Sequence, residues 1–109
     1  LAPLQQLGAH LAIGDARDAA FLAQAFEGAQ AAYVMIPPAY DAPDMRTSQA
    51  QFGSAIAAAI VRSGVRRVVN LSSVGAELAV GTGPIAGLHE QEERLNALAS
   101  IDLLHLRAG

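Results

Sequence analysis

The chain alternates short apolar runs with longer segments of helical period. Residues 9–13, 31–36, 66–71 and 101–106 form the apolar runs, and each is bounded by glycine, proline or polar residues. Runs of this length predict strands. The run from Ala31 to Ile36 is continuously apolar and stops at two prolines, which is typical of a strand buried on both faces.

Three helices are predicted between these strands. The first is capped by Asp18 and closed by Gly28, the second covers residues 47–63 before Gly64, and the third covers about 85–99. Their apolar stripes consist of Phe21, Leu22, Ala25 and Phe26; of Phe52, Ile56, Ala59 and Ile60; and of Leu88, Leu95, Leu98 and Ala99. The order β-α-β-α-β-α-β predicts an α/β fold with a parallel sheet and right-handed crossovers.

Composition narrows the class of protein. A chain of 109 residues predicts one domain, over residues 1–109, and 52% hydrophobic against 16% charged residues predicts a globule. The net charge is −3 and basic residues adjoin only at Arg66-Arg67, which argues against a nucleic-acid partner. No cysteine is present and no apolar run approaches the roughly 20 residues of a membrane span. We therefore expect a soluble, cytoplasmic protein that does not bind a membrane.

The basic residues are all arginines, because the sequence contains no lysine. This excludes any mechanism that needs a lysine within the chain, such as a Schiff base, a phosphate-loop lysine or a Tyr-xxx-Lys pair.

Candidate binding residues lie where the predicted strands end, since ligands of open parallel sheets bind outside the carboxyl ends of the strands. Asp15 follows Gly14, which would let a flat ring approach the backbone, while its carboxylate could accept from an exocyclic amine. A turn aspartate or helix cap is the more common use of this pattern, and we favour it on spacing alone. Ser72 and Ser73 could donate to a ligand or simply form a turn, and the local pattern does not decide between these roles.

The third helix carries candidate acid–base residues. His89 and Glu93 are neighbours on the helix surface at i, i+4 and could form a hydrogen-bonded pair, although a solvated pair is the commoner outcome. Glu92 is a rival for the same role, because it lies nearer the middle of the apolar stripe. Burial there would raise its pKa, as in many general acids; alternatively, it lies in a frayed first turn.

Two further patterns carry less weight. Gly81-x-Gly83-xxx-Gly87 is separated from the preceding strand, so we interpret the glycine-rich segment that begins at Gly75 as a flexible loop and not a phosphate loop. His10 and His105 fall inside predicted strands without carboxylates at suitable spacing, so no metal site is expected.

Taken in order, four segments of the chain resemble a known series. They are 14–18 (Gly-Asp-Ala-Arg-Asp), 31–38 (ending Met-Ile-Pro-Pro), 64–73 (ending Asn-Leu-Ser-Ser) and 103–109 (Leu-Leu-His-Leu-Arg-Ala-Gly). The chain resembles atypical short-chain dehydrogenase/reductases of the NmrA-like kind, which implies a Rossmann-like three-layer parallel sheet and NAD or NADP as cofactor.

The resemblance also implies roles for individual residues. Asp15 would touch the adenine, the segment Ile36, Pro37 and Pro38 would pass the nicotinamide-side ribose, and Ser72 and Ser73 would lie beside the nicotinamide. Ser73, His89 and Glu93 would then be the catalytic candidates. His89 and Glu93 fall where typical members carry the tyrosine and lysine of the Tyr-xxx-Lys pair, so the usual proton donor and its partner are missing.

The sequence also departs from the family at its start. No Gly-x-x-Gly-x-x-Gly loop is present and Leu1 is not an initiator methionine, so the chain looks like a partial NAD(P)-binding domain. Its first strand would then lack its usual neighbour. We expect residues 9–13 to pair directly with 31–36, because unpaired backbone groups are costly where water is excluded.

Three functions follow. The first is the NAD(P)-binding part of an NmrA-like reductase, whose family chemistry is hydride transfer from NAD(P)H to a small-molecule substrate. The second is a sensor of the same family that binds NAD(P) without turnover and acts on a protein partner. The third is a flavodoxin-like binding module that does not take a dinucleotide. For the 109-residue chain alone, the missing pyrophosphate contacts predict weak dinucleotide binding and no activity.

Overall fold

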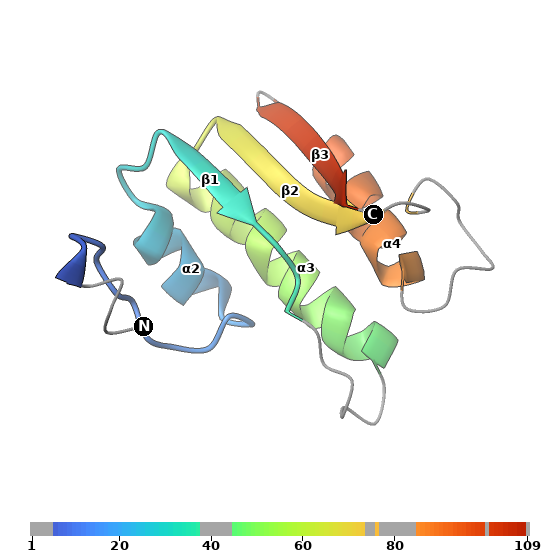
Figure 1. Cartoon of the computed structure of the whole chain (residues 1–109), viewed down its shortest axis with the longest axis horizontal. Coiled ribbons are helices and arrows are strands. Elements are labelled where there is room, and N and C mark those ends of the chain that lie inside the picture. Colours follow the sequence, from blue (N-terminus) through green and yellow to red (C-terminus); the bar gives the residue numbers. More distant parts are fainter. Residues whose placement is uncertain (1–5, 38–44, 74–75, 77–84, 100, 109) are drawn as a thin grey trace.

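The computed structural model describes residues 6–37, 45–73, 76, 85–99 and 101–108. Three helices and three strands alternate along them: α2 (Ala19–Phe26), β1 (Ala31–Val34), α3 (Met45–Ser63), β2 (Arg67–Ser73), α4 (Ile85–Asn96) and β3 (Asp102–Ala108) (Figure 1). Among these residues, no helix is both long and apolar enough to cross a membrane.

The strands form one parallel sheet in the order β1-β2-β3. Ala31 is the register partner of Arg67, and Arg67 is in turn the partner of Asp102, so the three strands start at one edge and run the same way. Figure 1 shows α3 and α4 behind this sheet. This alternation of helices with parallel strands confirms the predicted Rossmann-like α/β class.

The core lies between the sheet and the helices. The core cluster consists of Val34, Ile36, Ile56, Ala57, Ile60, Val65, Val68 and Leu95. Most of these residues lie on the strands or on α3 and α4, while Ile36 follows β1 and Val65 precedes β2. On α3, Ile56, Ala59 and Ile60 are buried and Phe52 packs against the core, which confirms the predicted stripe. On α4, Leu95 is buried while Ala99 is exposed, so the predicted stripe is wrong at its last member.

The start of α2 is encoded locally. Asp18 has an extended backbone, and its carboxylate accepts from the amides of Ala20 and Phe21, two amides that the helix itself leaves unsatisfied. Gly28 follows the helix with a φ of 80°, a conformation that other residues rarely adopt. The predicted cap and stop of this helix are both confirmed.

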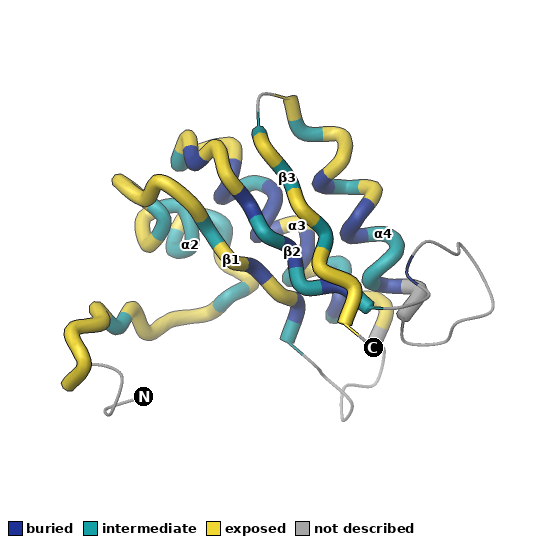
Figure 2. The backbone as a smooth tube through the Cα atoms, turned by 45° about the horizontal axis from the view of Figure 1, so that its top comes forward, coloured by how far each residue is buried: buried dark blue, intermediate teal, exposed yellow. Residues whose placement is uncertain are grey.

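The predicted strand over residues 9–13 is not formed, and its predicted pairing with 31–36 is wrong. These residues have no regular structure, and Figures 1 and 2 place them apart from the sheet. Ile13 is 86% exposed. The expectation assumed that water would be excluded from this segment, but an exposed backbone hydrogen-bonds to solvent at little cost.

The described helices cover one face of the sheet, and the opposite face is exposed along both outer strands (Figure 2). Its large apolar side chains are Tyr33, Met35, Leu104 and Leu106, which are 44–59% exposed. The described residues therefore form two of the three layers that the sequence predicts. The glycine-rich loop predicted around residues 75–83 lies outside the described residues apart from Ala76.

Candidate site at the carboxyl ends of the strands

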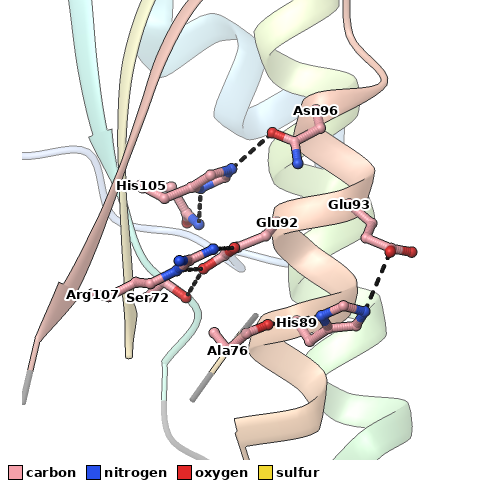
Figure 3. A network of polar contacts seen from close by, with 9 residues as sticks. Ser72, Ala76, His89, Glu92, Glu93, Asn96, His105 and Arg107 are labelled. Atoms are coloured by element: carbon pink, nitrogen blue, oxygen red, sulfur yellow. Dashed lines mark hydrogen bonds and ion pairs between the residues drawn. The ribbon is translucent and has the colours of Figure 1, made fainter. Parts of the chain in front are cut away.

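The carboxyl ends of β1, β2 and β3 lie at one edge of the sheet, because the strands are parallel. Helix α4 runs back across them and presents three polar side chains at a spacing of three and four residues: His89, Glu92 and Asn96 (Figure 3). This spacing puts them on one helical face. Each meets a different partner on the adjoining strands or loop.

Glu92 is the buried centre of an ion-pair network. Arg107, on β3, donates from Nε to Glu92 Oε2 at 3.0 Å and from Nη2 to Oε1 at 2.7 Å. The Ser72 hydroxyl, on β2, donates to Oε2 at 2.6 Å. The Glu92 side chain is 5% exposed, whereas that of Arg107 is 42% exposed. One carboxylate therefore joins α4 to two neighbouring strands.

This network overturns the sequence-based expectation for Glu92. Its pKa is lowered from the ordinary value, chiefly by the hydrogen bonds from Arg107 and further by that from Ser72, although burial acts in the opposite direction. Periodicity indicated the burial correctly but did not indicate the arginine. Glu92 therefore stays ionised and is not a general acid with a raised pKa.

His105 forms a second contact between strands and helix. Asn70 Nδ2 donates to His105 Nδ1 at 3.1 Å, and His105 Nε2 donates to Asn96 Oδ1 at 2.9 Å. This pattern is that of a neutral ring protonated on Nε2. Burial lowers the pKa of His105, and the nearby Arg107 acts in the same direction, while Glu92 acts against it.

His89 contacts the segment that follows β2. Its Nδ1 donates to the Ala76 carbonyl at 2.7 Å, and Ala76 N in turn donates to the Ser73 carbonyl at 3.0 Å. His89 Nε2 lies 3.3 Å from Glu93 Oε1, so the predicted i, i+4 pair is formed. The Glu93 side chain is 72% exposed, whereas that of His89 is 16% exposed. The histidine is thus held near the end of β2, while its partner lies at the surface.

Asp15 is a turn residue in this structure. Its carboxylate accepts from the amide, Nε and Nη2 of Arg17 at 2.8–3.1 Å, and the hydrogen bonds from Arg17 lower its pKa. The ring that approaches Gly14 is that of Phe21, which a Cβ at Gly14 would overlap. Both features agree with the turn interpretation favoured by the sequence. No contact joins Asp15 to the other candidates described here.

The remaining candidates differ in what they can offer a ligand. Ile36 is buried in the core, so only its main chain can line the edge, while Pro37 is partly exposed. Pro38 lies outside the described residues. The Ser72 hydroxyl is directed at Glu92, and Ser73 is the last residue of β2, with its side chain on the opposite face by strand alternation.

The structure thus brings Ser72 together with Glu92 and not with His89 or Glu93. Sequence reasoning missed Arg107, Asn70 and His105 as members of this site. The available signal was the alternation of Asn70 and Ser72 along an apolar strand, which places two polar side chains towards the core. Within the described part of the chain, no group of three or more His, Asp or Glu side chains is arranged to hold a metal ion.

Comparison with known proteins defines the family. The model of the NmrA-like family matches residues 1–88. The chain belongs to the NmrA-like family. No curated protein sequence matches this NmrA-like chain significantly.

Two solved structures resemble the NmrA-like chain in fold. Both are of the triphenylmethane reductase of Citrobacter sp., one described as complexed with NADP(H) and the other in connection with the bioremediation of triphenylmethane dyes. Their TM-scores are 0.79 and 0.78, each at 22% identity. Each match covers 97% of this chain and 35% of the reductase, so the chain spans about a third of that protein.

Proposed function

We propose that this NmrA-like chain is part of an NAD(P)-binding domain, over residues 1–109, whose complete polypeptide transfers hydride from NAD(P)H to a small molecule. The observation that carries the proposal is the edge of the parallel sheet at the carboxyl ends of β1 and β2, with α4 packed against β2. Dinucleotides bind at such edges in Rossmann-like folds. The NADP(H) complex of the structurally similar Citrobacter reductase supports the same assignment.

The residues at this edge suit part of a dinucleotide. Ser73 is the last residue of β2, and the main chain of Ile36 and Pro37 follows β1, where it can lie against a ribose or a ring. Pro38, the next residue, stays a proposed contact on the strength of the family resemblance. Ser72 adjoins them but serves Glu92. Asp15 stays a proposed adenine contact, in which Arg17 would have to share the carboxylate. When bound, NAD(P)H would supply the hydride.

His89 is the proposed proton donor, with Glu93 as its partner. The Ala76 carbonyl fixes the orientation of the ring through Nδ1, so Nε2 is the nitrogen directed away from the loop and towards Glu93. With Nδ1–H held by this carbonyl, Nε2 has a proton to deliver only in the imidazolium form, and His89 would then act in place of the tyrosine that typical family members carry at this position. Ser73, the third catalytic candidate, would hydrogen-bond to the substrate or nicotinamide.

Cofactor binding tests the proposal most directly. The complete polypeptide should bind NADPH or NADH in a calorimetric or fluorescence titration. If neither binds, the redox interpretation fails and a binding module without dinucleotide is favoured. Oxidation of the bound NADPH by a triphenylmethane dye, quinone, azo compound or aldehyde would then establish turnover.

A non-catalytic NAD(P) sensor is the second candidate. It is favoured by one specific observation, namely that the chain contains no lysine. The resemblance to short-chain dehydrogenases, which implies His89 and Glu93 where typical members carry the catalytic tyrosine and lysine, agrees with it. Binding of NADPH without oxidation by any of these acceptors would support it.

In an active polypeptide, His89→Ala should lower kcat by about 10²-fold or more, the usual contribution of a positioned proton donor. Glu93→Ala should have a smaller effect, because its carboxylate is mostly exposed. Steady-state kinetics would measure both variants, with Glu90→Gln on the same helix as the control. Unchanged turnover in both test variants would show that neither His89 nor Glu93 takes part in catalysis.

A further inference from the structure

The interface between α4 and the sheet is apolar near the starts of the strands and polar towards their carboxyl ends. Near the strand starts, the register partners Val68 and Leu103 pack in the apolar core with Leu95. The next inward-facing partners are Asn70 with His105, and then Ser72 with Arg107. We call the polar side chains of this second half, together with Glu92 and Asn96, the polar seam (Figure 3). It lies towards the carboxyl ends of β2 and β3.

Within the polar seam, Glu92 bonds to two strands at once. Its carboxylate receives three hydrogen bonds, and the two donor residues, Ser72 and Arg107, are register partners on neighbouring strands. A bidentate arginine–carboxylate pair is directional, whereas apolar contacts allow sliding and rotation. Three bonds to one nearly buried carboxylate therefore fix both strand ends relative to α4.

Stability alone does not explain a charged pair at this place. A well-packed apolar cluster of the same volume often stabilises a fold as well as a buried ion pair does, because the ions lose their hydration. A directional ion pair is useful where two elements must keep one relative orientation. The carboxyl edge of the sheet is the place where the orientation of Ser73 and Ala108 would matter for a ligand.

We propose that Glu92 is a positioning residue that holds the carboxyl ends of β2 and β3, and with them Ser73 and Ala108, in the arrangement that receives the cofactor. The inference rests on the proposed function, since only a bound ligand gives that edge a role. Ser72 is then the inward-facing serine that anchors the strand end, and Ser73, on the opposite face, is the serine that meets the ligand.

The test uses the complete polypeptide and the variant Glu92→Gln, which keeps the shape of the side chain but removes the bidentate acceptor. Glu90→Gln is the matched control, because Glu90 also pairs with an arginine, Arg46, but at the surface of the same helix. Ile60→Val controls for destabilisation, since it thins the core away from the polar seam. If Glu92→Gln does not fold, Arg107→Lys takes its place, because lysine keeps the positive charge but cannot donate the two parallel hydrogen bonds of a guanidinium.

Two readouts separate this inference from the proposed function. Calorimetric titration with NADPH, at a temperature where every variant is folded, should show about tenfold or greater weakening for Glu92→Gln, as expected when binding groups are misplaced. Affinities of the two controls should stay within about twofold of the parent. Hydrogen exchange without cofactor should rise at the ends of β2 and β3 in Glu92→Gln, and not at their starts.

Each outcome decides the inference. Unchanged NADPH affinity in folded Glu92→Gln overturns it, as does equal weakening in Ile60→Val, which would mean that affinity follows stability alone. Unchanged exchange at the strand ends also overturns it. If the parent protein binds no dinucleotide at all, the proposed function fails, and the exchange measurement still shows whether Glu92 fixes the strand ends.

Discussion

At the scale of single residues, the partner of a side chain decided its chemistry more than its own position did. Periodicity correctly placed Glu92 near the buried stripe of α4, and burial by itself raises the pKa of a carboxyl. The lowered pKa has its cause in Arg107, which is 15 residues further along the chain and on another element. Asp15 shows the opposite case, because its partner Arg17 is only two residues away and a turn was the favoured interpretation.

Glu92→Gln should reduce the free energy of unfolding by about 1–3 kcal/mol at pH 7. This loss is smaller than the loss expected on breaking a fully buried ion pair, because Arg107 is partly exposed. The pKa of Glu92 is lower in the folded than in the unfolded state, so its stabilising effect is complete above the ordinary value of 4.5. That effect is lost as the pH falls through the lowered folded value.

Urea denaturation from pH 7 down to below pH 4 measures this difference. The gap between the parent and Glu92→Gln should be constant at neutral pH and should narrow only in the acidic range. A gap that stays constant throughout would show that Glu92 does not titrate with folding. Glu90→Gln, which loses an exposed ion pair, should cost less than about 1 kcal/mol.

At the scale of elements, the sequence predicted helices well where local signals end them. Asp18 and Gly28 bound α2, and Gly64 follows α3 with a φ of 76°. These signals act over a few residues, so they do not depend on the rest of the fold. Strands depend on partners, which explains the failure at residues 9–13: their apolar pattern is strand-like, but the segment lies apart from the sheet.

Asp18→Ala should destabilise the fold by about 1 kcal/mol, because the amides of Ala20 and Phe21 lose their acceptor at the helix start. Asp18→Asn, which can still accept, should cost much less. Thermal unfolding followed by circular dichroism would compare the two variants. Equal losses in both would indicate that the charge of Asp18, and not its cap, is responsible.

The contact of α3 with α4 depends on the glycine at position 87, which the helical periodicity does not explain. A Cβ at Gly87 would overlap the buried side chain of Gln49. Gly87→Ala should therefore destabilise by about 1–3 kcal/mol through overpacking, although alanine favours a helix by about 1 kcal/mol. Chemical denaturation would measure the net effect, with Gly87→Ala in a Gln49→Ala background as the control that removes the clash. Stabilisation by Gly87→Ala in the parent would contradict the close contact.

At the scale of the whole molecule, the described residues form one covered and one exposed face of a three-stranded sheet. The continuous apolar run at 31–36 indicated burial on both faces, but Tyr33 and Met35 are exposed. The candidate site at the carboxyl edge of the sheet consists of few groups: Ser73, the main chain after β1, and the neighbourhood of His89. These contacts reach only part of a dinucleotide.

The 109-residue chain expressed alone should therefore bind NADPH with a Kd weaker than micromolar, since most of the binding energy of a dinucleotide comes from contacts beyond these residues. Calorimetry with the isolated chain and with the complete polypeptide, under the same conditions, would compare the two. Micromolar affinity of the isolated chain would contradict this expectation and would locate the main contacts within it.

The sequence by itself determined the order of helices and strands from residue 19 onwards, the cap of α2, the stops of α2 and α3, and most of the apolar core. It also carried the resemblance to the NmrA-like family. All of these depend on local pattern or on the order of segments, whereas the end of α4 at Asn96 fell short of the predicted residue 99. Only the tertiary structure decided which strands pair, which face of the sheet is covered and which side chains meet in the polar seam. Glu92, Ser72 and Arg107 lie on three different elements, and no spacing along the chain records that they converge on one carboxylate. Their chemistry follows from this meeting, because a neighbouring charge changes a pKa only across the distance that folding sets.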